Sequence, residues 1–465
     1  MSTRTCLTII LAAGEGKRMA SSLPKVVHPV AGLPMVCHVL DTAKDAGASD
    51  IAVVVGNKAE LVSETVKAHH EGTTVHLQTQ RDGTAHAVLA ARDAVDPSHD
   101  DVVVLYGDVP LVKTETILAA RRALAEGADI VVLGFKTQTP KGYGRLIVEN
   151  GQLTAIREEK DASDAERAID FCNSGIMAFC APHMLEVLDA ISNDNSQGEY
   201  YLTDAVEIGR AKGLSVVAAE VPEDETLGVN DRVQLAEVEK RWQDRKRHEL
   251  MLSGVAMSAP QTVFLHHDTV LEGDVVLEQN IVFAQGVRVE QGAIIRAFSH
   301  LEGAHVQRNA IVGPYARLRP GASIGEGSKI GNFVEIKAAT IGNGAKVNHL
   351  SYIGDADVGE KANIGAGAIT CNYDGYNKYK TTIGAGAFIG TNTSLVAPVE
   401  IGENANTAAG SVITKSVPED DLAIERNRQA NLAGKAKSLR KRYAAAKAAK
   451  TAKAAKAAKS EKSAK

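Results

Sequence analysis

The chain has 465 residues, which is too long for one compact core and predicts two or three domains. Its 44% hydrophobic and 23% charged residues are ordinary, but 41 Gly against 4% aromatic residues exclude a conventional packed core throughout. No apolar run approaches the roughly 20 residues of a membrane helix, and we expect a cytoplasmic protein without a membrane span. No CxxC pair occurs, so spacing predicts neither a disulfide framework nor a zinc motif for Cys6, Cys37, Cys172, Cys180 and Cys371.

The first 230 residues predict an α/β domain, because short β-branched runs alternate with helical patterns. The expected strands are apolar on both faces, as in a mostly parallel sheet covered by helices. They cover Leu7–Ala12, Ile51–Val55, Val102–Tyr106 and Ile130–Phe135. Between the first two, the pattern predicts a helix from about Pro34 to Ala46, which Gly47 ends.

A long connecting helix is expected next, from about Asp231 to Leu252. The segment contains no Gly or Pro and is dense in charge, and its few apolar residues predict a mostly exposed helix. We therefore expect domains at 1–230 and 254–434, joined by a linker helix at 231–253 and followed by a tail at 435–465.

Beyond residue 260 an aliphatic residue recurs about every six positions, commonly followed by Gly, from Ile324 to Val412. This hexapeptide repeat predicts a parallel β-helix in which each coil takes three hexads and the aliphatic side chains stack inward. Some 150 residues give roughly eight coils and a prism about 40 Å long. The polar, Tyr-rich segment between Ile364 and Ile383 interrupts the repeat and predicts a protruding loop that carries function.

The net charge of −5 conceals an asymmetry between the tail and the rest of the chain. Residues 435–465 carry twelve Lys or Arg and one acid, Glu461, a net charge of +11, which leaves −16 for the remainder. Lysines spaced by three wind around a helix and leave no packed face, so we interpret the tail as solvated. The alternative is a weak, salt-sensitive attraction to nucleic acid or anionic surfaces, without a specific nucleic-acid partner.

A Gly-rich loop follows the first expected strand, in the segment LAAGEGKRMASSLPK. Gly14 and Gly16 let the backbone approach a phosphate chain, and Arg18 and Lys25 bring positive charge. The third Gly of a Rossmann fingerprint and the GK[ST] of a Walker loop are missing. The pattern GxGxRM followed by PK resembles the signature of sugar-1-phosphate nucleotidyltransferases, which implies that Leu11 and Ala12 also contact substrate.

Two further segments agree with this resemblance. QTQRDGTAHAV resembles the family's uracil-recognition segment, which implies that Gln78 reads the base edge and that Gly83 and Thr84 approach it. LYGDVPL ends an expected strand at Tyr106 and places Gly107 and Asp108 just past it, where open α/β sheets bind ligands. Asp108 supplies one oxygen for Mg²⁺, and Asn230 resembles the second. Taken separately, Asp108 would usually be only a turn residue and Asn230 is as plausibly a helix cap, but their combination with the Gly-rich loop favours the metal-binding interpretation.

The segments GYGR, EEKD and CNSG resemble those that line the N-acetylhexosamine, with Gly144, Glu158 and Asn173 as the implied contacts. QGEYYLTD, at 197–204, is a further match.

On the repeats, FVEIK, HLSYIGD and the inserted CNYDG extend the likeness to nearly the whole chain. It resembles the bacterial family of bifunctional N-acetylglucosamine-1-phosphate uridylyltransferase/glucosamine-1-phosphate N-acetyltransferases. This resemblance implies a left-handed coil, contrary to ordinary crossover rules, and a homotrimer with acetyl-transfer sites between subunits. The implied sugar-phosphate residues are Arg319, Lys337, Tyr352, Asn363, Asn372 and Tyr373. The implied acetyl-CoA residues are Ala366, Thr391, Ala409 and Arg426.

The chemistry of the implied reaction requires a base. An amine that attacks a thioester must be uncharged and must lose a proton, and a His titrating near neutrality suits this role. We therefore expect His349 to be the general base, with Glu335 orienting or polarising it, although a lone His in a repeat protein is more often a surface residue.

We predict a two-site cytoplasmic enzyme. One site acetylates glucosamine 1-phosphate with acetyl-CoA, and the other joins N-acetylglucosamine 1-phosphate to the α-phosphate of UTP. Arg18, Lys25 and Mg²⁺ stabilise the developing charge there, and pyrophosphate leaves. The product is UDP-N-acetylglucosamine, a cell-envelope precursor. The alternatives are a single-activity nucleotidyltransferase whose coils only oligomerise or regulate, and a non-enzymatic sugar-nucleotide scaffold.

Overall fold

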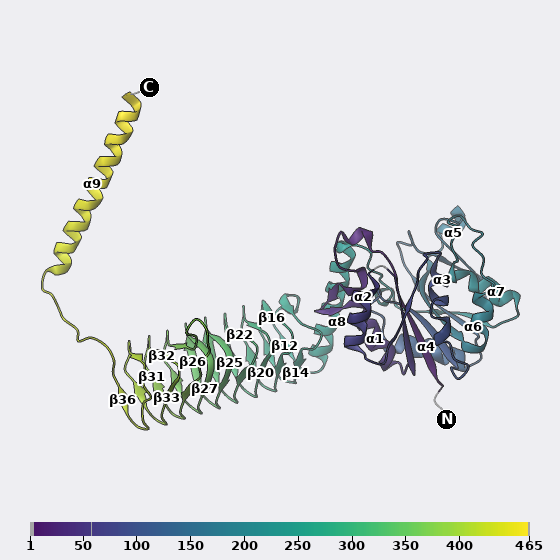
Figure 1. Cartoon of the computed structure of the whole chain (residues 1–465). Coiled ribbons are helices and arrows are strands. Elements are labelled where there is room, and N and C mark those ends of the chain that lie inside the picture. Colours follow the sequence, from purple (N-terminus) through teal and green to yellow (C-terminus); the bar gives the residue numbers. More distant parts are fainter. Residues whose placement is uncertain (1–3, 57, 464–465) are drawn as a thin grey trace.

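A computed structural model describes residues 4–56 and 58–463 of the chain, so the first residues of the expected 1–230 domain and the end of the 435–465 tail lie outside the described residues. The chain folds into an α/β unit, a long row of coils and a terminal helix (Figure 1). Within the described ranges, no helix is both long and apolar enough to cross a membrane.

A nine-stranded mixed sheet forms the centre of the α/β unit, with the main strand order β11-β7-β10-β6-β1-β4-β5. β1 pairs in parallel with β4 and β6, whereas β10 runs antiparallel to β6 and β7. The strands are β1 (Cys6–Ala12), β4 (Asp50–Val55), β5 (Thr74–Leu77), β6 (Asp101–Tyr106), β7 (Ile130–Lys136), β8 (Arg145–Glu149), β9 (Gln152–Arg157), β10 (Phe171–Cys180) and β11 (Val216–Glu220). β2 (Pro29–Val30) and β3 (Leu33–Pro34) form a separate pair. The four expected strands and the mostly parallel sheet are confirmed.

Helices cover both faces of this sheet. Along β1, Leu7, Ile9 and Leu11 join one buried cluster, while Cys6, Ile10 and Ala12 join another, which accounts for a strand apolar at every position. The first face packs against α3 (Thr84–Leu89), α6 (Ala181–Leu188) and α7 (Ala205–Ala211). The second packs against α1 (Met35–Asp45), α2 (Ala59–His69) and α4 (Thr114–Ala125). A short α5 (Asp164–Arg167) lies between β9 and β10.

The helix α8 (Arg232–Leu252) joins the unit to the coils. Asp231 caps it by accepting hydrogen bonds from the N–H groups of Val233 and Gln234. Although most of the helix is exposed, the buried Gln243 exchanges two hydrogen bonds with the backbone of Leu265 in the first coil. Trp242 packs against the cores of both regions, so this single aromatic ring links them.

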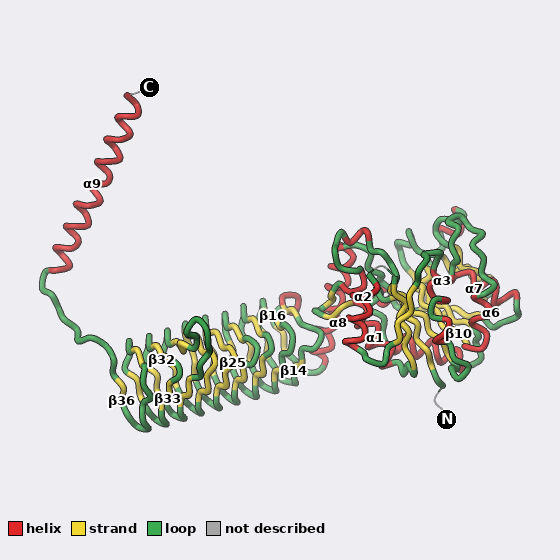
Figure 2. Tube along the Cα trace, in the orientation of Figure 1, coloured by secondary structure: helices red, strands yellow, loops and turns green. Residues whose placement is uncertain are grey.

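The coils form a parallel β-helix with one continuous core, as predicted (Figure 2). One face is a ten-stranded sheet, so the expected number of about eight coils is too low. Val276 pairs with Ile294 and Ile294 pairs with Ile311, so successive coils take 18 and 17 residues. The undercount arises because the coils extend from Ala256 to Ala423, which is longer than the roughly 150 residues on which the expected number was based.

The strands of the ten-stranded face are β12 (Ala256–Met257), β15 (Val276–Leu277), β18 (Ile294–Ile295), β21 (Ile311–Val312), β24 (Lys329–Asn332), β26 (Lys346–His349), β28 (Asn363–Ile364), β31 (Phe388–Ile389), β34 (Asn406–Thr407) and β36 (Leu422–Ala423). The other two faces contain β13 (Val263–Phe264), β14 (Val270–Leu271), β16 (Ile281–Phe283), β17 (Arg288–Val289), β19 (His300–Leu301), β20 (Ala304–Val306), β22 (Arg317–Leu318), β23 (Ala322–Ile324), β25 (Glu335–Ile341), β27 (Tyr352–Val358), β29 (Ile369–Cys371), β30 (Thr381–Ile383), β32 (Ser394–Val396), β33 (Val399–Ile401) and β35 (Val412–Ile413).

The aliphatic residues at the predicted repeat positions point inward, with one exception. Val412 is 44% exposed, whereas its neighbour Ile413 is buried. Counting in steps of six from Ile383 reaches Ile401, then the buried Thr407, and then Ile413. Because Thr407 is polar, the repeat pattern does not identify it as a core position and predicts Val412 in place of Ile413. The tail forms a single helix, α9 (Lys435–Ser463), which extends away from the coils in Figure 1. Its residues are exposed or half-buried through Lys453.

Candidate functional site

A cleft of about 260 Å³ lies where β1 and β6 end side by side, because Leu11 of β1 pairs with Tyr106 of β6. The chain segments that follow parallel strands emerge at the same edge of the sheet, which places their side chains around one cavity. Eight residues predicted from the sequence line it, namely Leu11, Gly14, Lys25, Gln78, Gly83, Thr84, Tyr106 and Asp108.

The Gly-rich loop is shaped by the close approach of Lys25. Gly16 adopts a φ of 64°, and a Cβ there would lie 2.7 Å from Cβ of Lys25. Any other residue would therefore be strained and would push Lys25 away from the loop. Gly14 has more room, since its nearest neighbour would be Cε of Lys25 at 3.8 Å. The loop thus holds a lysine against exposed backbone N–H groups, which is an arrangement that binds phosphates.

Two oxygen-bearing side chains converge on the same ammonium group. Lys25 Nζ donates a hydrogen bond to Asp108 Oδ2 and another, at 3.3 Å, to Asn230 Oδ1. The N–H of Val229 donates to the backbone oxygen of Asp108 at 3.0 Å, and this contact fixes Asn230 beside Asp108. Because a carboxylate and an amide oxygen already surround one cationic nitrogen, the pair fits a divalent cation that takes one or two protein oxygens.

The predicted base-recognition segment is tied to a second loop. A Cβ on Gly83, whose φ is 115°, would lie 2.4 Å from the backbone oxygen of Tyr200. Thr84 Oγ1 accepts a hydrogen bond from the N–H of Leu202 at 2.9 Å. Gln78 is buried, and its Nε2 lies 3.4 Å from the backbone oxygen of Gly83. Glycine is required here because the two loops touch backbone to backbone.

The three predicted sugar-contacting residues come together beside Tyr106. A Cβ on Gly144 would lie 3.5 Å from both Asn173 Cβ and Glu158 Oε1, and the N–H of Asn173 donates to the oxygen of Gly144 at 2.8 Å. Burial raises the pKa of Glu158. Burial, together with the carboxylates of Glu158 and Asp108, raises the pKa of Tyr106. Tyr106 therefore lies between Asp108 and Glu158, and its phenol stays neutral.

The structure adds one basic residue that the sequence interpretation missed and leaves another outside the cleft. Arg81 lines the cleft and forms an ion pair with Glu15, which also pairs with Lys17 at 2.6 Å. The signal was its place between Gln78 and Gly83, inside the segment compared with uracil recognition. Arg18 is exposed in the short 3₁₀ turn Lys17–Met19 and is not among the lining residues.

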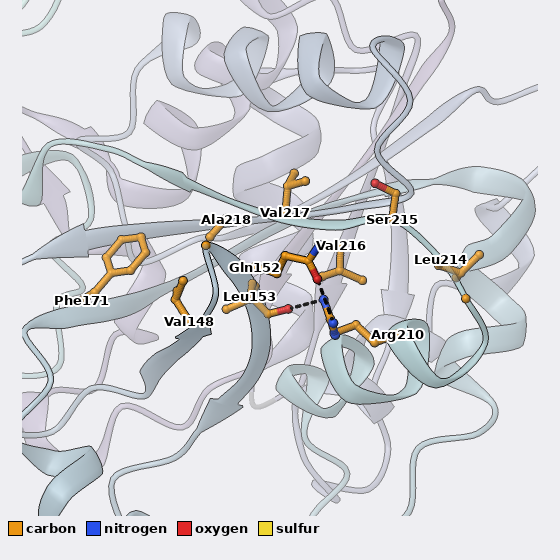
Figure 3. Close-up of a pocket in the computed structure, with 12 residues that line it drawn as sticks. Val148, Gln152, Leu153, Phe171, Arg210, Leu214, Ser215, Val216, Val217 and Ala218 are labelled. Carbon is orange, nitrogen blue, oxygen red and sulfur yellow. Dashed lines mark hydrogen bonds between the residues drawn. The ribbon is translucent and has the colours of Figure 1, made fainter.

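A roomier cavity, of about 570 Å³, lies elsewhere in the α/β unit, between the β8–β9 hairpin, α7 and the edge strand β11 (Figure 3). Its walls include Val148, Leu153 and Val216, and it contains none of the residues predicted from the sequence. The charged group in it, Arg210, is occupied by hydrogen bonds to Gln152 Oε1 at 3.2 Å and to the oxygen of Leu153 at 3.1 Å. Its size therefore does not make it the better candidate for phosphate chemistry.

A second group of predicted residues lies on successive coils of the β-helix. The register pairs Glu335 with Tyr352 and Lys337 with Gly354, so the predicted Glu335 and Lys337 lie one coil from the predicted Tyr352. Arg319 donates to Glu335 Oε1 at 2.8 Å, and Lys337 Nζ lies 3.2 Å from Asp355 Oδ2. Asp355, which the sequence interpretation missed, also accepts a hydrogen bond from Asn372.

The inserted loop folds back onto this group. The carboxylate of Asp374 accepts hydrogen bonds from the N–H groups of Tyr376 at 2.8 Å and Asn377 at 2.7 Å, which closes a tight turn. A bridge between Tyr373 and Lys378 completes a small hairpin. Nearby Lys337 lowers the pKa of Lys378, as expected for two ammonium groups held close together. The loop therefore adds positive charge beside Arg319 and Lys337, which suits a phosphate.

His349 lies on the adjacent ten-stranded face and is exposed. Its Nδ1 is 2.8 Å from Oδ1 of Asn332, the residue directly below it in the register. Glu335, which was expected to orient His349, pairs with Arg319 instead. Asn332 could have been found from the sequence, since it precedes His349 by one coil length of 17 residues.

The four residues compared with an acetyl-CoA site form a column near the C-terminal end of the coils. Backbone hydrogen bonds link Ala366 to Asn392 and Thr391 to Gly410, each at 2.8 Å, so these residues lie on successive coils. Arg426 donates to the oxygen of Ala409 at 2.7 Å. Asn363 lies in β28, on the coil above His349.

Comparison with known proteins agrees with both regions. The family model of the MobA-like NTP transferase domain matches residues 8–202, and that of the bacterial transferase hexapeptide, of six repeats, matches residues 303–338 and 380–415. The bifunctional protein GlmU of Sinorhizobium fredii is 57% identical over 445 residues, which cover 96% of this chain and 98% of that protein. Those of Rhizobium rhizogenes and Brucella anthropi are 56% and 57% identical over 96% of this chain and 98% and 99% of their own lengths.

Proposed function

The chain belongs to the family of bifunctional GlmU proteins and has uridylyltransferase and acetyltransferase activity, and from this premise we propose how its residues divide the work. Residues 1–230 form the uridylyltransferase domain and residues 254–434 the acetyltransferase domain. Residues 231–253 are the linker helix, and residues 435–465 are a basic tail. Acetylation comes first, and its product is the substrate of the uridylyl transfer.

In the acetyl transfer, the amine of glucosamine 1-phosphate attacks the thioester carbonyl of acetyl-CoA. The C–N bond forms, the C–S bond breaks, and free coenzyme A leaves as the thiol. Arg319, Lys337 and Lys378 hold the sugar phosphate, with Tyr352, Asn363, Asn372 and Tyr373 around the sugar. Ala366, Thr391, Ala409 and Arg426 line the acetyl-CoA site. The support for the phosphate end is the group of three basic side chains, in which Lys337 contacts Asp355, Arg319 contacts Glu335, and Lys378 lies close to Lys337.

His349 is the general base of this step. An amide oxygen only accepts hydrogen bonds, so the 2.8 Å contact with Asn332 Oδ1 favours the tautomer that carries its proton on Nδ1. Nε2 then has a free lone pair and takes the proton that the attacking amine loses. Asn332 takes the orienting role that the sequence interpretation gave to Glu335, while Glu335 holds Arg319 in place.

In the uridylyl transfer, the phosphate oxygen of N-acetylglucosamine 1-phosphate attacks the α-phosphate of UTP, and pyrophosphate leaves. Gln78, Gly83 and Thr84 hold the uracil, and Gly144, Glu158 and Asn173 hold the sugar. The Gly14–Gly16 backbone, Lys25 and Arg81 face the triphosphate, where positive charge stabilises the transition state. Arg18, at the edge of the Gly-rich loop, also stabilises the negative charge that develops on the triphosphate.

The divalent metal implied by the family is Mg²⁺, held by Asp108 and Asn230. When bound, Mg²⁺ neutralises charge on the reacting phosphate and on the leaving pyrophosphate. The hydrogen bonds of Lys25 to both oxygens support this assignment, because they show that the two ligands can share one cation. With the metal held by Asp108 and Asn230, Lys25, which lines the same cleft, would be free to contact the phosphates.

The protein works as a homotrimer whose acetyl-transfer sites lie between subunits. The support is a ladder of exposed apolar side chains along one corner of the coils, Phe298, Tyr315, Phe333 and Leu350, which are 48%, 46%, 55% and 62% exposed. The first three rings stack at centroid distances of 4.9 and 5.1 Å. The ladder ends at the residue next to His349, so a second copy that covers it also encloses the base.

The UTP and acetyl-CoA substrates place the enzyme in the cytoplasm, where its five cysteines remain as free thiols. The observation that supports two activities best is the presence of two separate sets of phosphate-binding side chains, one in the cleft and one on the coils.

The test supplies glucosamine 1-phosphate, acetyl-CoA and UTP, and follows free thiol and pyrophosphate separately. We expect both to form, with thiol first. Pyrophosphate from N-acetylglucosamine 1-phosphate without any thiol release from glucosamine 1-phosphate would favour the single-activity alternative.

A further inference from the structure

Three metal-ligating side chains meet at the end of the sheet opposite the nucleotide cleft. Asp129 directly precedes β7, Cys180 is the last residue of β10, and His183 lies in the first turn of α6. One ligand atom from each lies within 4.8 Å of the other two, and His183 Nε2 is 3.6 Å from Asp129 Oδ1. Cysteine spacing predicts no zinc motif here because these ligands come from three different elements.

The fold fixes each member of this group. The N–H of Cys180 donates to the backbone oxygen of Asp129 at 2.8 Å, where the antiparallel pair of β7 and β10 begins. The N–H of Ser215, at the edge of the cavity in Figure 3, donates to Asp129 Oδ2 at 2.9 Å, which leaves Oδ1 directed toward His183. His183 follows Cys180, the residue that precedes α6, by three residues, which is about one helical turn, and Pro182 lies in the same first turn.

The donor set selects a particular class of ion. A thiolate and an imidazole are ligands for zinc-like transition metals, whereas Mg²⁺ and Ca²⁺ take oxygen ligands. Three protein ligands with a remaining position for water is a common zinc arrangement. The side chains of Asp129 and His183 are 24% and 44% exposed, so an ion from solvent can reach them.

The surrounding charges permit such an ion. Arg4 lies beside the Cys180 thiol and is held to Asp101 through its Nε at 3.0 Å, so its charge is shared with the carboxylates of Asp101 and Asp129 on the same side of the group.

We propose that Asp129, Cys180 and His183 bind a divalent transition-metal ion of the zinc class, with water in the fourth position. Cys180 pairs with Asp101 at the start of β6, whereas the cleft lies beyond Tyr106 at the end of that strand. A six-residue strand separates the two places by roughly 17 Å. The ion therefore joins β7, β10 and α6 as a structural link and takes no part in either transfer reaction.

Cobalt(II) is the probe, added to the full-length protein after treatment with a chelator. A cobalt–thiolate bond gives a charge-transfer absorption in the near ultraviolet, which oxygen and nitrogen ligands do not produce. Binding at Asp108 and Asn230, or at the other candidate group, His266, His267 and Asp268, is therefore silent in this band. We expect one equivalent of the band in the wild type, and its displacement by zinc.

Cys180→Ser and His183→Ala should each remove the band, and Cys371→Ser should keep it. Cys371 is the matched control, because it is also partly exposed but belongs to neither candidate group found among residues 4–56 and 58–463. Zinc should raise the thermal unfolding midpoint of the wild type and leave that of His183→Ala unchanged.

The proposal is overturned by the absence of a sulfur-to-cobalt band in the wild type, or by a band that survives in Cys180→Ser. A band that depends on Cys371 would also overturn it. If Cys180→Ser fails to fold by circular dichroism, the half-exposed His183→Ala variant decides, because its substitution leaves the core intact.

Discussion

The α/β unit and the β-helix place their functional side chains in opposite ways. In the α/β unit, parallel strands end together, and loops distant in the sequence enclose a cleft within one chain. In the β-helix, each coil repeats the position of the last, so residues 17 or 18 apart form rows along a solvent-facing surface. A sheet edge can therefore enclose a substrate alone, whereas a stack of coils needs a second surface to do so.

The largest effect is expected from a substitution of His349. His349→Ala should reduce acetyl transfer by about 10²–10⁴-fold, because the attacking amine loses its general base. Uridylyl transfer from N-acetylglucosamine 1-phosphate should be unchanged, since the two sites lie in separate regions. Release of thiol and of pyrophosphate are measured separately. A folded variant that loses both activities would mean that the sites are not independent.

The converse variant is Asp108→Asn in the cleft. We expect uridylyl transfer to fall by about 10²–10³-fold, because the charge that holds the cation is lost next to the reacting phosphates. Acetyl transfer should keep its wild-type rate in the thiol assay. An unaffected rate of pyrophosphate release would show that the Asp108 carboxylate does not serve the reaction.

A substitution in the apolar ladder tests whether the acetyl-transfer site needs a second copy of the chain to enclose its substrate. Phe333→Lys should weaken self-association by about 2 kcal/mol or more, since it places a charge at the centre of a covered apolar surface. Acetyl transfer should fall with the loss of the oligomer, and uridylyl transfer should persist. Sedimentation at several protein concentrations measures the assembly. Phe264→Lys is the control, because Phe264 is also an exposed ring, at 51%, but lies outside the ladder. Equal effects of the two substitutions would exclude the ladder as the interface.

The smallest effect concerns stability of the α/β unit. Burial raises the pKa of Asp204 to about 6, above the value of about 3.9 for an unfolded chain. Because this carboxyl group holds its proton more tightly in the folded protein, the free energy of unfolding falls as the pH rises from about 4 to 6, and the loss is complete above pH 6. Asp204→Asn removes this penalty, so its advantage in unfolding midpoint over the wild type should grow across that interval. Parallel curves would contradict the assignment.

The fold could be predicted because its patterns are local. Leu7–Ala12 is apolar throughout since both faces of β1 are covered, and the aliphatic repeat follows directly from the length of a coil. The predicted repeat was wrong at Val412, because the preceding inward position is Thr407, which hydropathy alone does not identify.

The candidate sites could be predicted less completely, because partners in space leave little trace along the chain. Resemblance located Asp108 and His349, but not Arg81, Asp355 or Asn332, which act through contacts with other elements. The group formed by Asp129, Cys180 and His183 has no motif at all, since β7 and β10 meet only in the folded sheet.

The independence of the two sites on one chain can be measured by mixing His349→Ala with Asp108→Asn. Supplied with glucosamine 1-phosphate, acetyl-CoA and UTP, each variant alone should form almost no UDP-N-acetylglucosamine. The equimolar mixture should restore its formation, because the acetylated intermediate diffuses from the intact acetyltransferase sites of one variant to the intact clefts of the other. A mixture that stays as inactive as its components, although both variants are folded, would contradict the account.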